Sequence, residues 1–316
     1  MTLSTDTNPI QSGEPDKAAK TLFGQPLAGL FHLLVIYVVW GSTYLAIRVA
    51  VRDGAGWPPF FMGASRVLVA GLLLLGYAKL RRRPLLPSRR DLITLAISGT
   101  IMWVGANGLV NWAEMRVESG LAALIVGSMP MWTALQEAVL NRKVPTIRLI
   151  VSLLVGFSGL VLLSLHTIHG DVPGDIWAII ALILSPNLWI AGSLLQSRRP
   201  VKLGPAASSG WQQLLASISY FAIAFLIHEP LPAPIPEAWV AWGYLVVFGS
   251  LFAFTSLIQA LRLLPTTIIM TYAYVNPVIA VILGYLILRE SVTIWTVMGM
   301  VLVIVGVLGV FREKKK

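Results

Sequence analysis

Two apolar segments, Gly127-Ser128-Met129-Pro130 and, 147 residues later, Tyr274-Val275-Asn276-Pro277, each carry a proline near their middle. The stretch 113–163 aligns with 260–310 at this offset without a gap, which matches Ala113 with Ala260, Arg142 with Arg289, and Gly159 with Gly306. Transporters show such weak internal repeats, with hydrophobic helices broken at corresponding positions around a binding site in the middle of the membrane. The repeat therefore predicts a kind of function as well as a fold.

The composition is that of a membrane protein. Hydrophobic residues make up 56% of the 316 residues, charged residues make up 12%, and the mean hydropathy is +0.78. A water-soluble domain of this size does not tolerate such values. A transmembrane helix needs about 20 apolar residues, and ten segments meet this need: 27–51, 58–80, 91–111, 118–140, 146–167, 174–197, 205–228, 237–260, 266–288 and 291–311. We therefore predict an all-α integral membrane protein with ten transmembrane helices.

The repeat boundary near residue 170 divides these helices into two units of five. Because five is odd, the second unit enters the membrane from the opposite side, so the two repeats are expected to be inverted. The predicted parts are a disordered tail (1–26), a first five-helix repeat (27–168), a second repeat (172–311) and a basic C-terminal tail (312–316). The first tail lacks the basic-then-apolar order of a signal peptide, so the helix that follows it is expected to remain in the mature protein.

Basic residues are concentrated on alternate connections between the helices. Nineteen Lys and Arg fall on the side of the two termini, three fall on the other side, and Arg48 and Arg66 lie within helices. This imbalance predicts that both termini face the cytoplasm. The net charge of +10 thus orients the chain in the membrane and does not indicate a nucleic-acid partner.

Several short strings carry a resemblance to a known family. They are Trp40-Gly41-Ser42-Thr43-Tyr44, Trp57-Pro58-Pro59 followed by Arg66, Asn107-Gly108 with Ala113-Glu114, Ser119-Gly120-Leu121-Ala122-Ala123 through Pro130, and Tyr272-Ala273-Tyr274-Val275-Asn276-Pro277 through Arg289-Glu290. In order and spacing they resemble the EamA family of the drug/metabolite transporter superfamily, and especially its YedA-type branch. The resemblance implies a ten-helix inner-membrane exporter of small metabolites, amino acids or related compounds. One departure is that the family's Leu-Gly-Glu-like turn is replaced in the first repeat by Asn141-Arg142-Lys143.

One group of polar and aromatic residues is predicted near the middle of the membrane. Such side chains are costly at that depth unless they are paired or face a wet cavity. Pro130 and Pro277 each remove a backbone donor, which frees a carbonyl one turn earlier and marks a candidate hinge. We expect a substrate-binding cavity here, although packing between helices would also explain these residues. The candidates are Trp40, Thr43, Tyr44, Trp103, Trp132, Asn187, Trp189, Tyr272, Tyr274 and Asn276.

Other polar residues are candidates for gating or coupling. In the outer half these are Arg48, Arg66, Asn107, Asn111 and Glu114, and Arg66 is expected to pair with Glu114 as a gate or as a static ion pair. Glu137 is the most deeply placed acid, so it is a candidate for proton coupling, unless it reaches toward Arg142 and the interface.

Some classes of function lack the residues that they need. The chain has no cysteine, no phosphate-binding loop, no pair of metal-ligating histidines within the helices and no Ser–His–Asp constellation, so we expect no cofactor, no metal, no ATPase subunit and no enzyme activity. The expected partners are a small-molecule substrate and the lipid bilayer. A secondary exporter of amino acids or related compounds, working by alternating access, is the leading prediction. The alternatives are a multidrug or organic-cation exporter and, from a different class, a membrane-embedded enzyme. The absence of Lys or Arg at the predicted midplane argues against phosphorylated sugars, which would need a cationic clamp.

Overall fold

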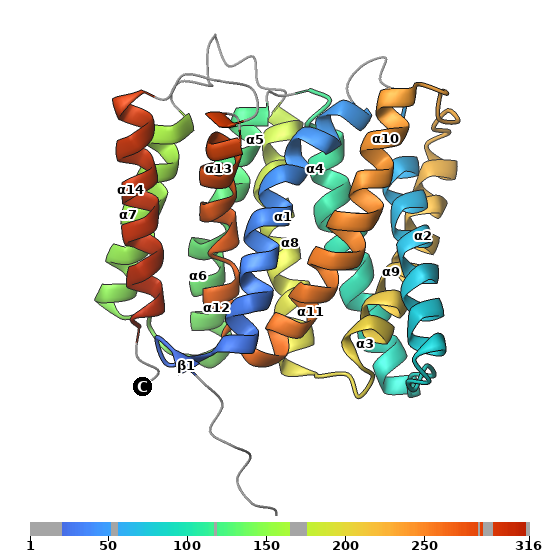
Figure 1. Ribbon diagram of the computed structural model, residues 1–316, viewed down its shortest axis with the longest axis horizontal. Helices are drawn as coiled ribbons and strands as arrows, with labels where there is room; N and C mark the ends of the chain where they lie inside the picture. The colour runs from blue at the N-terminus through green and yellow to red at the C-terminus, as the bar shows by residue number, and fades with distance from the viewer. Residues whose placement is uncertain are drawn as a thin grey trace, which may run out of the picture.

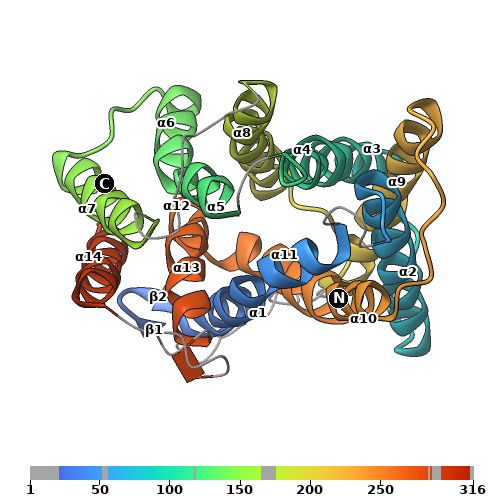
Figure 2. The same ribbon diagram turned by 90° about the horizontal axis from the view of Figure 1, so that it is seen from above.

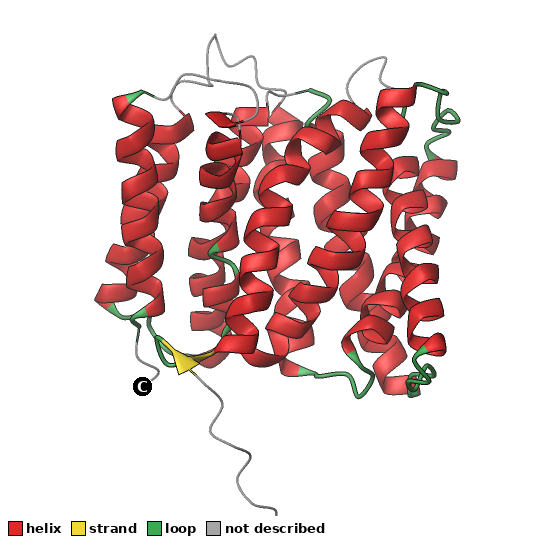
Figure 3. Ribbon diagram, in the orientation of Figure 1, coloured by secondary structure: helices red, strands yellow, loops and turns green. Residues whose placement is uncertain are grey.

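The chain folds as a bundle of long helices that run roughly side by side (Figures 1 and 3). The computed structural model describes residues 21–51, 56–116, 119–164, 176–283, 285–286 and 293–313. The side chains of two predicted site residues, Tyr44 and Arg48, lie outside this description, as do Arg289 and Glu290. A short antiparallel pair of strands, β1 (Thr21–Leu22) and β2 (Gln25–Pro26), precedes the bundle.

The helices follow the predicted apolar segments closely. In the first half they are α1 (Leu27–Val51), α2 (Pro59–Leu80), α3 (Arg89–Gly99), η1 (Thr100–Asn107), α4 (Gly108–Ala113), α5 (Ser119–Gly127), α6 (Met129–Asn141) and α7 (Ile147–Ser164). In the second half they are α8 (Ile176–Arg198), α9 (Pro205–Leu226), α10 (Pro236–Tyr244), η2 (Leu245–Ala253), α11 (Phe254–Leu263), α12 (Thr266–Ile269), α13 (Tyr272–Leu283) and α14 (Ile294–Phe311). Seven helical stretches of the described chain are long and apolar enough to cross a membrane.

The outer surface of the bundle is apolar. On α14, for example, Val301, Ile304 and Val305 are each about half exposed, and so are Val151 and Leu154 on α7. A soluble protein rarely exposes apolar surface so extensively. In a bilayer, lipid tails would cover this apolar surface. A helix also keeps its backbone hydrogen bonds within itself, as a spanning segment must.

Two helix pairs join the first half of the chain to the second, and glycines bring both pairs close together. A Cβ added at Gly71 of α2 would lie 2.9 Å from the carbonyl oxygen of Gly210 in α9. Likewise a Cβ added at Gly159 of α7 would lie 2.7 Å from the carbonyl oxygen of Gly299 in α14. Small residues allow such backbone approach, which is how membrane helices associate without a hydrophobic drive. The glycine spacing of α14 thus serves packing within the chain.

Both halves also contain a stretch of π-helix, with one more residue per hydrogen-bonded turn than an α-helix. The η1 stretch continues α3 into α4, and the η2 stretch continues α10 into α11. Thr100–Asn107 and Leu245–Ala253 lie almost one repeat offset apart. Because π-helical turns are rare and occur frequently at functional sites, this pair directs attention to what η1 and η2 contact.

The loop between α9 and α10 contacts the start of α2. The Glu229 carboxylate accepts hydrogen bonds from the backbone N–H groups of Phe60 (3.1 Å) and Phe61 (2.7 Å). These N–H groups belong to the first turn of α2, which has no helical acceptors and carries a partial positive charge. A residue from the second half thereby caps a helix of the first.

Candidate functional site

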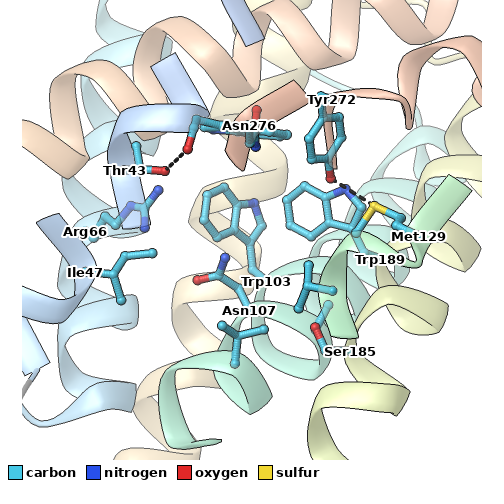
Figure 4. A pocket seen from close by; sticks show the side chains of 14 residues that line it. Thr43, Ile47, Arg66, Trp103, Asn107, Met129, Ser185, Trp189, Tyr272 and Asn276 are labelled. Carbon is cyan, nitrogen blue, oxygen red and sulfur yellow. Dashed lines mark hydrogen bonds between the residues drawn. The ribbon is translucent and has the colours of Figure 1, made fainter. Parts of the chain in front are cut away.

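A small cavity lies inside the bundle where the two halves of the chain meet (Figure 4). Seen from above, α2 lies beside α9 and α7 lies beside α14, so helices of the two halves are neighbours (Figure 2). The volume of the cavity is about 80 Å³, enough for several water molecules, so a solute of amino-acid size requires it to widen. Side chains from α1, α2, η1 and α4–α6 meet side chains from α8 and α13. The lining residues are Trp40, Thr43, Ile47, Arg66, Trp103, Ala106, Asn107, Val110, Val126, Met129, Ser185, Trp189, Tyr272 and Asn276.

Aromatic rings form much of the cavity wall. Trp40 meets Trp189 edge to face at 5.5 Å between centroids and meets Tyr272 in the same way at 4.9 Å. Trp103 of η1 meets Trp189 at 6.1 Å. Edge-to-face pairs at such distances are the favoured geometry for aromatic side chains. The result is a wall with ordered ring faces, suited to an apolar or aromatic part of a solute.

A positive charge, Arg66, also lines the cavity. Its side chain is only 3% exposed, and its Nε donates a 2.8 Å hydrogen bond to Ser250 Oγ of η2. The guanidinium carbon lies 5.2 Å from the centre of the Trp103 ring, and Figure 4 shows the group directed toward that ring. Sequence reasoning placed Arg66 in an outer group apart from the midplane residues, yet the structure brings both into one cavity. This cavity therefore holds a cationic group, which the sequence did not lead us to expect beside the predicted midplane residues.

Two indole donors at the cavity have no hydrogen-bond partner. Nε1 of Trp103 and Nε1 of Trp189 are both buried and unpaired in the part of the chain that the structure describes. By contrast, Nε1 of Trp40 donates to the Gly249 carbonyl of η2 at 3.2 Å. Unpaired buried donors are uncommon and call for an explanation, such as a ligand or water.

Asn276 is tied to backbone on the α13 side of the cavity. With its amide oriented to satisfy both ends, Nδ2 donates to the carbonyl oxygens of Tyr272 (3.0 Å) and Tyr37 (3.3 Å). Asn276 therefore bridges α13 and α1 beside Pro277, at the junction of the two halves.

The structure brings only part of the predicted binding set to the cavity. Trp40, Thr43, Trp103, Trp189, Tyr272 and Asn276 line it, together with Arg66 and Asn107 from the predicted outer group. Trp132, Asn187 and Tyr274 are not among the lining residues. Each has a contact elsewhere: Trp132 donates to Ser128 Oγ, Asn187 accepts from Gln136, and Tyr274 donates to the Leu153 carbonyl of α7.

Sequence reasoning missed six lining residues: Ile47, Ala106, Val110, Val126, Met129 and Ser185. Helical spacing could have found several of them. Ile47 lies seven residues after Trp40, and Ser185 lies four residues before Trp189, so each shares a helix face with a predicted residue.

Two further candidates for gating, Asn111 and Glu114, are not among the residues described as lining this cavity. Asn111 is buried and points Nδ2 toward the Pro59 carbonyl at 3.5 Å, and Glu114 is half-buried at the end of α4. The contacts described for Arg66 are with Ser250 and Trp103, so the pairing of Arg66 with Glu114 stays a prediction. The two candidate hinges differ, because Pro130 stands at the start of α6 just after a break at Ser128, whereas Pro277 lies inside α13.

Glu137 takes part in a polar contact toward the end of the bundle where the described chain begins and ends. Thr267 Oγ1 of α12 donates a 2.5 Å hydrogen bond to Glu137 Oε2 of α6. Both residues line a wider recess of about 1280 Å³, which is also lined by Arg148, Arg198 and Arg312. Glu137 therefore contacts α12 and lines an open recess whose wall also carries arginine side chains.

Comparisons with known proteins agree on one family. A sequence model of the EamA-like transporter family matches residues 27–165 and again residues 173–312. The sequence is 33% identical to the uncharacterized inner membrane transporter YedA of Escherichia coli (strain K12), over 261 residues that cover 82% of both proteins. It is 25% identical to a probable terminal-alkyne amino-acid exporter of Streptantibioticus cattleyicolor, over 90% of this chain and 93% of that protein. A solved crystal structure superposes with a TM-score of 0.74 at 17% identity, covering 90% of this chain and 96% of that one, which shows likeness of fold alone.

Proposed function

The chain belongs to the EamA-like transporter family, and from this premise we propose that it is a secondary exporter of small metabolites, namely amino acids or related compounds. The family membership confirms the resemblance predicted from the sequence, and with the spanning helices it identifies a multi-pass membrane transporter. The named substrate class rests on the implied family function and on the similarity to a probable amino-acid exporter.

The observation that carries this proposal is the position of the cavity between the two halves. Trp40 and Trp103 of the first half meet Trp189 and Tyr272 of the second across it. Transporters built from repeats place their substrate at such a junction, and rocking of one half against the other exposes it to each side in turn.

The proposed cycle uses ten crossings arranged as two inverted repeats, with both termini in the cytoplasm. In support, the described chain begins and ends at the same end of the bundle (Figure 1). The pairing of α2 with α9 and of α7 with α14 joins helices in corresponding places of the two halves. We propose that bending near Pro130 and Pro277 accompanies the rocking, and that contacts such as that of Glu137 with Thr267 open and close the cytoplasmic path.

Counterflow in proteoliposomes tests this function, because it requires no assumption about driving force. Liposomes preloaded with single unlabelled amino acids are given the same amino acid in labelled form, and a transporter that accepts it accumulates label transiently. We expect accumulation for a subset of amino acids, and we expect Asn276→Ala to lose it because this residue bridges α13 and α1 at the cavity. Trp132→Phe is the matched control, since Trp132 lies outside the cavity.

If no amino acid is exchanged, the substrate class is wrong. Exchange of organic cations in the same liposomes would then establish the alternative, a multidrug exporter. Equal loss in Asn276→Ala and Trp132→Phe would contradict the assignment of the cavity as the binding site.

A further inference from the structure

We propose that Arg66 binds the carboxylate of the transported solute, so that the cavity selects monoanionic or zwitterionic solutes and rejects those that carry only a positive charge. This inference rests on the proposed transport function and specifies how the site chooses its substrate. It gives Arg66 a binding role in place of the gating role expected from the sequence.

The positive charge of Arg66 is buried without a described opposite charge beside it. Arg66 is 3% exposed, and a buried charge is strongly unfavourable unless an opposite charge and hydrogen bonds compensate it. No Asp or Glu is found among the residues described as lining the cavity. The compensation within the described chain comes from one neutral hydroxyl, Ser250 Oγ, and from the face of the Trp103 ring. A negative charge in the cavity would complete it.

The terminal nitrogens of the Arg66 guanidinium are placed to donate hydrogen bonds to a ligand. A guanidinium has five N–H donors in a rigid fork, and the bond from Nε to Ser250 uses one of them while fixing the plane of the group. The terminal nitrogens remain for a ligand, and a carboxylate can accept two parallel hydrogen bonds from this fork. The glycine at position 249 leaves room beside the fork, since a Cβ there would lie 2.7 Å from Nη2 of Arg66.

The cavity wall has more buried hydrogen-bond donors than acceptors to pair with them. The buried Nε1–H groups of Trp103 and Trp189 have no partner in the described chain, and both residues line the cavity with Arg66. An indole N–H can only donate, so a solute with acceptor oxygens satisfies these groups whereas an ammonium cannot. One fixed positive charge matches a single carboxylate better than a dianionic phosphate. The rings of Trp40 and Tyr272 on the other side then face the solute's apolar part.

The test uses matched ligands on the full-length protein in detergent, with the ligand-dependent shift of melting temperature as the readout. Each of several amino acids, including phenylalanine and alanine, is compared with its amide and with the acid that lacks the amino group. Binding to the native state raises the melting temperature, and the rise grows with the logarithm of the ratio of ligand concentration to Kd. We expect the amino acid and the des-amino acid to bind, and the amide, which keeps the ammonium and loses the carboxylate, to bind about 10- to 100-fold more weakly.

Variants locate the effect. Arg66→Gln is expected to remove the preference of acid over amide, and Arg66→Lys to keep part of it, because an ammonium retains the charge without the fork. Gly249→Ala leaves the arginine in place but displaces Nη2, so it should weaken the acids selectively; it also serves if Arg66→Gln does not fold. Ser158→Ala, on the exposed face of α7, is the control.

Equal binding of amides and acids to the native protein, or an unchanged preference in both Arg66→Gln and Gly249→Ala, would overturn the proposal. So would a lack of binding by every carboxylate in the panel. The first two outcomes are distinct from failure of the proposed function: a protein that exchanges amino acids and their amides equally well would still be a transporter, but without carboxylate selection by Arg66. A lack of binding by every carboxylate would contradict the amino-acid substrate class as well.

Discussion

The contact between α7 and α14 makes a quantitative prediction for Gly306→Ala. A Cβ at position 306 would lie 2.5 Å from both Cα and N of Gly156, and 2.7 Å from the carbonyl oxygen of Ser152. All three atoms are backbone, so no side-chain rotation relieves the contact. Because ordinary contacts between such atoms begin at about 3.5 Å, the helices must separate locally by about 1 Å.

The expected cost of this separation is about 1–3 kcal/mol, the usual range for over-packing. In soluble domains of 150–250 residues each kcal/mol lowers the melting temperature by about 2–4 °C, so we expect a fall of several degrees. Thermal unfolding of the purified protein in mild detergent, followed by tryptophan fluorescence and by loss of the monodisperse peak, measures it.

Gly76→Ala on α2 is the matched control. A Cβ at position 76 meets nothing within 4 Å, and alanine favours a helix over glycine by up to about 1 kcal/mol. This variant should therefore melt at or slightly above the temperature of the unmodified protein. If Gly306→Ala melts together with Gly76→Ala, then the two helices are not as close as described, and the reasoning fails.

Three further predictions concern polar contacts. Burial raises the pKa of the Glu229 carboxyl above its ordinary value of 4.5, although the N–H groups of Phe60 and Phe61 act to lower it. The contribution of Glu229 to stability is therefore full below about pH 4.5 and is lost as the pH rises through the raised pKa. The difference in melting temperature between the unmodified protein and Glu229→Gln should fall with rising pH, and a difference that grows would show the opposite sign of shift. Ser250→Ala leaves Nε of Arg66 without its acceptor, so it should destabilise the protein by about 1–3 kcal/mol in the same melting assay, whereas an unchanged melting temperature would mean that this hydrogen bond contributes nothing. Glu137→Gln should keep counterflow, because an amide oxygen still accepts from Thr267; loss of counterflow would instead show that the negative charge is required for the conformational cycle.

Much of the fold could be predicted because the bilayer leaves few choices. Apolar length sets where a spanning helix lies, and most predicted segments begin and end within a few residues of a described helix. The number of crossings and their inverted arrangement stay predictions. The π-helical stretches could not be predicted, because their residues carry no pattern that separates an extra residue per turn from an ordinary α-helix.

The candidate site shows that the depth of a residue in the membrane does not by itself predict whether its side chain lines the cavity. Tyr272 and Tyr274 lie at nearly the same depth, but residues two apart on a helix point about 200° apart. The structure accordingly places Tyr272 at the cavity and Tyr274 against Gly156 of α7. For Arg66 the depth of the Cα was misleading, because the long side chain carries its charge away from that depth and into the cavity. The sequence thus predicted the helices that line the cavity better than the helix faces that do so.

The π-helical stretch η1 lies in the wall of the cavity, where it supplies Trp103, Ala106 and Asn107. Each successive residue of an α-helix turns by about 100°, so a π-helical turn that relaxes to an α-helical one rotates everything beyond it by roughly that angle, without exposing any backbone group to lipid. Applied to η1, such a rotation would carry Trp103 away from the cavity and bring a neighbouring aliphatic side chain, Met102 or Val104, toward it. A bulky indole that lies under the Arg66 charge would be exchanged for a small aliphatic group. A transition of this kind would change what a solute meets in the cavity by turning one part of a helix about its own axis.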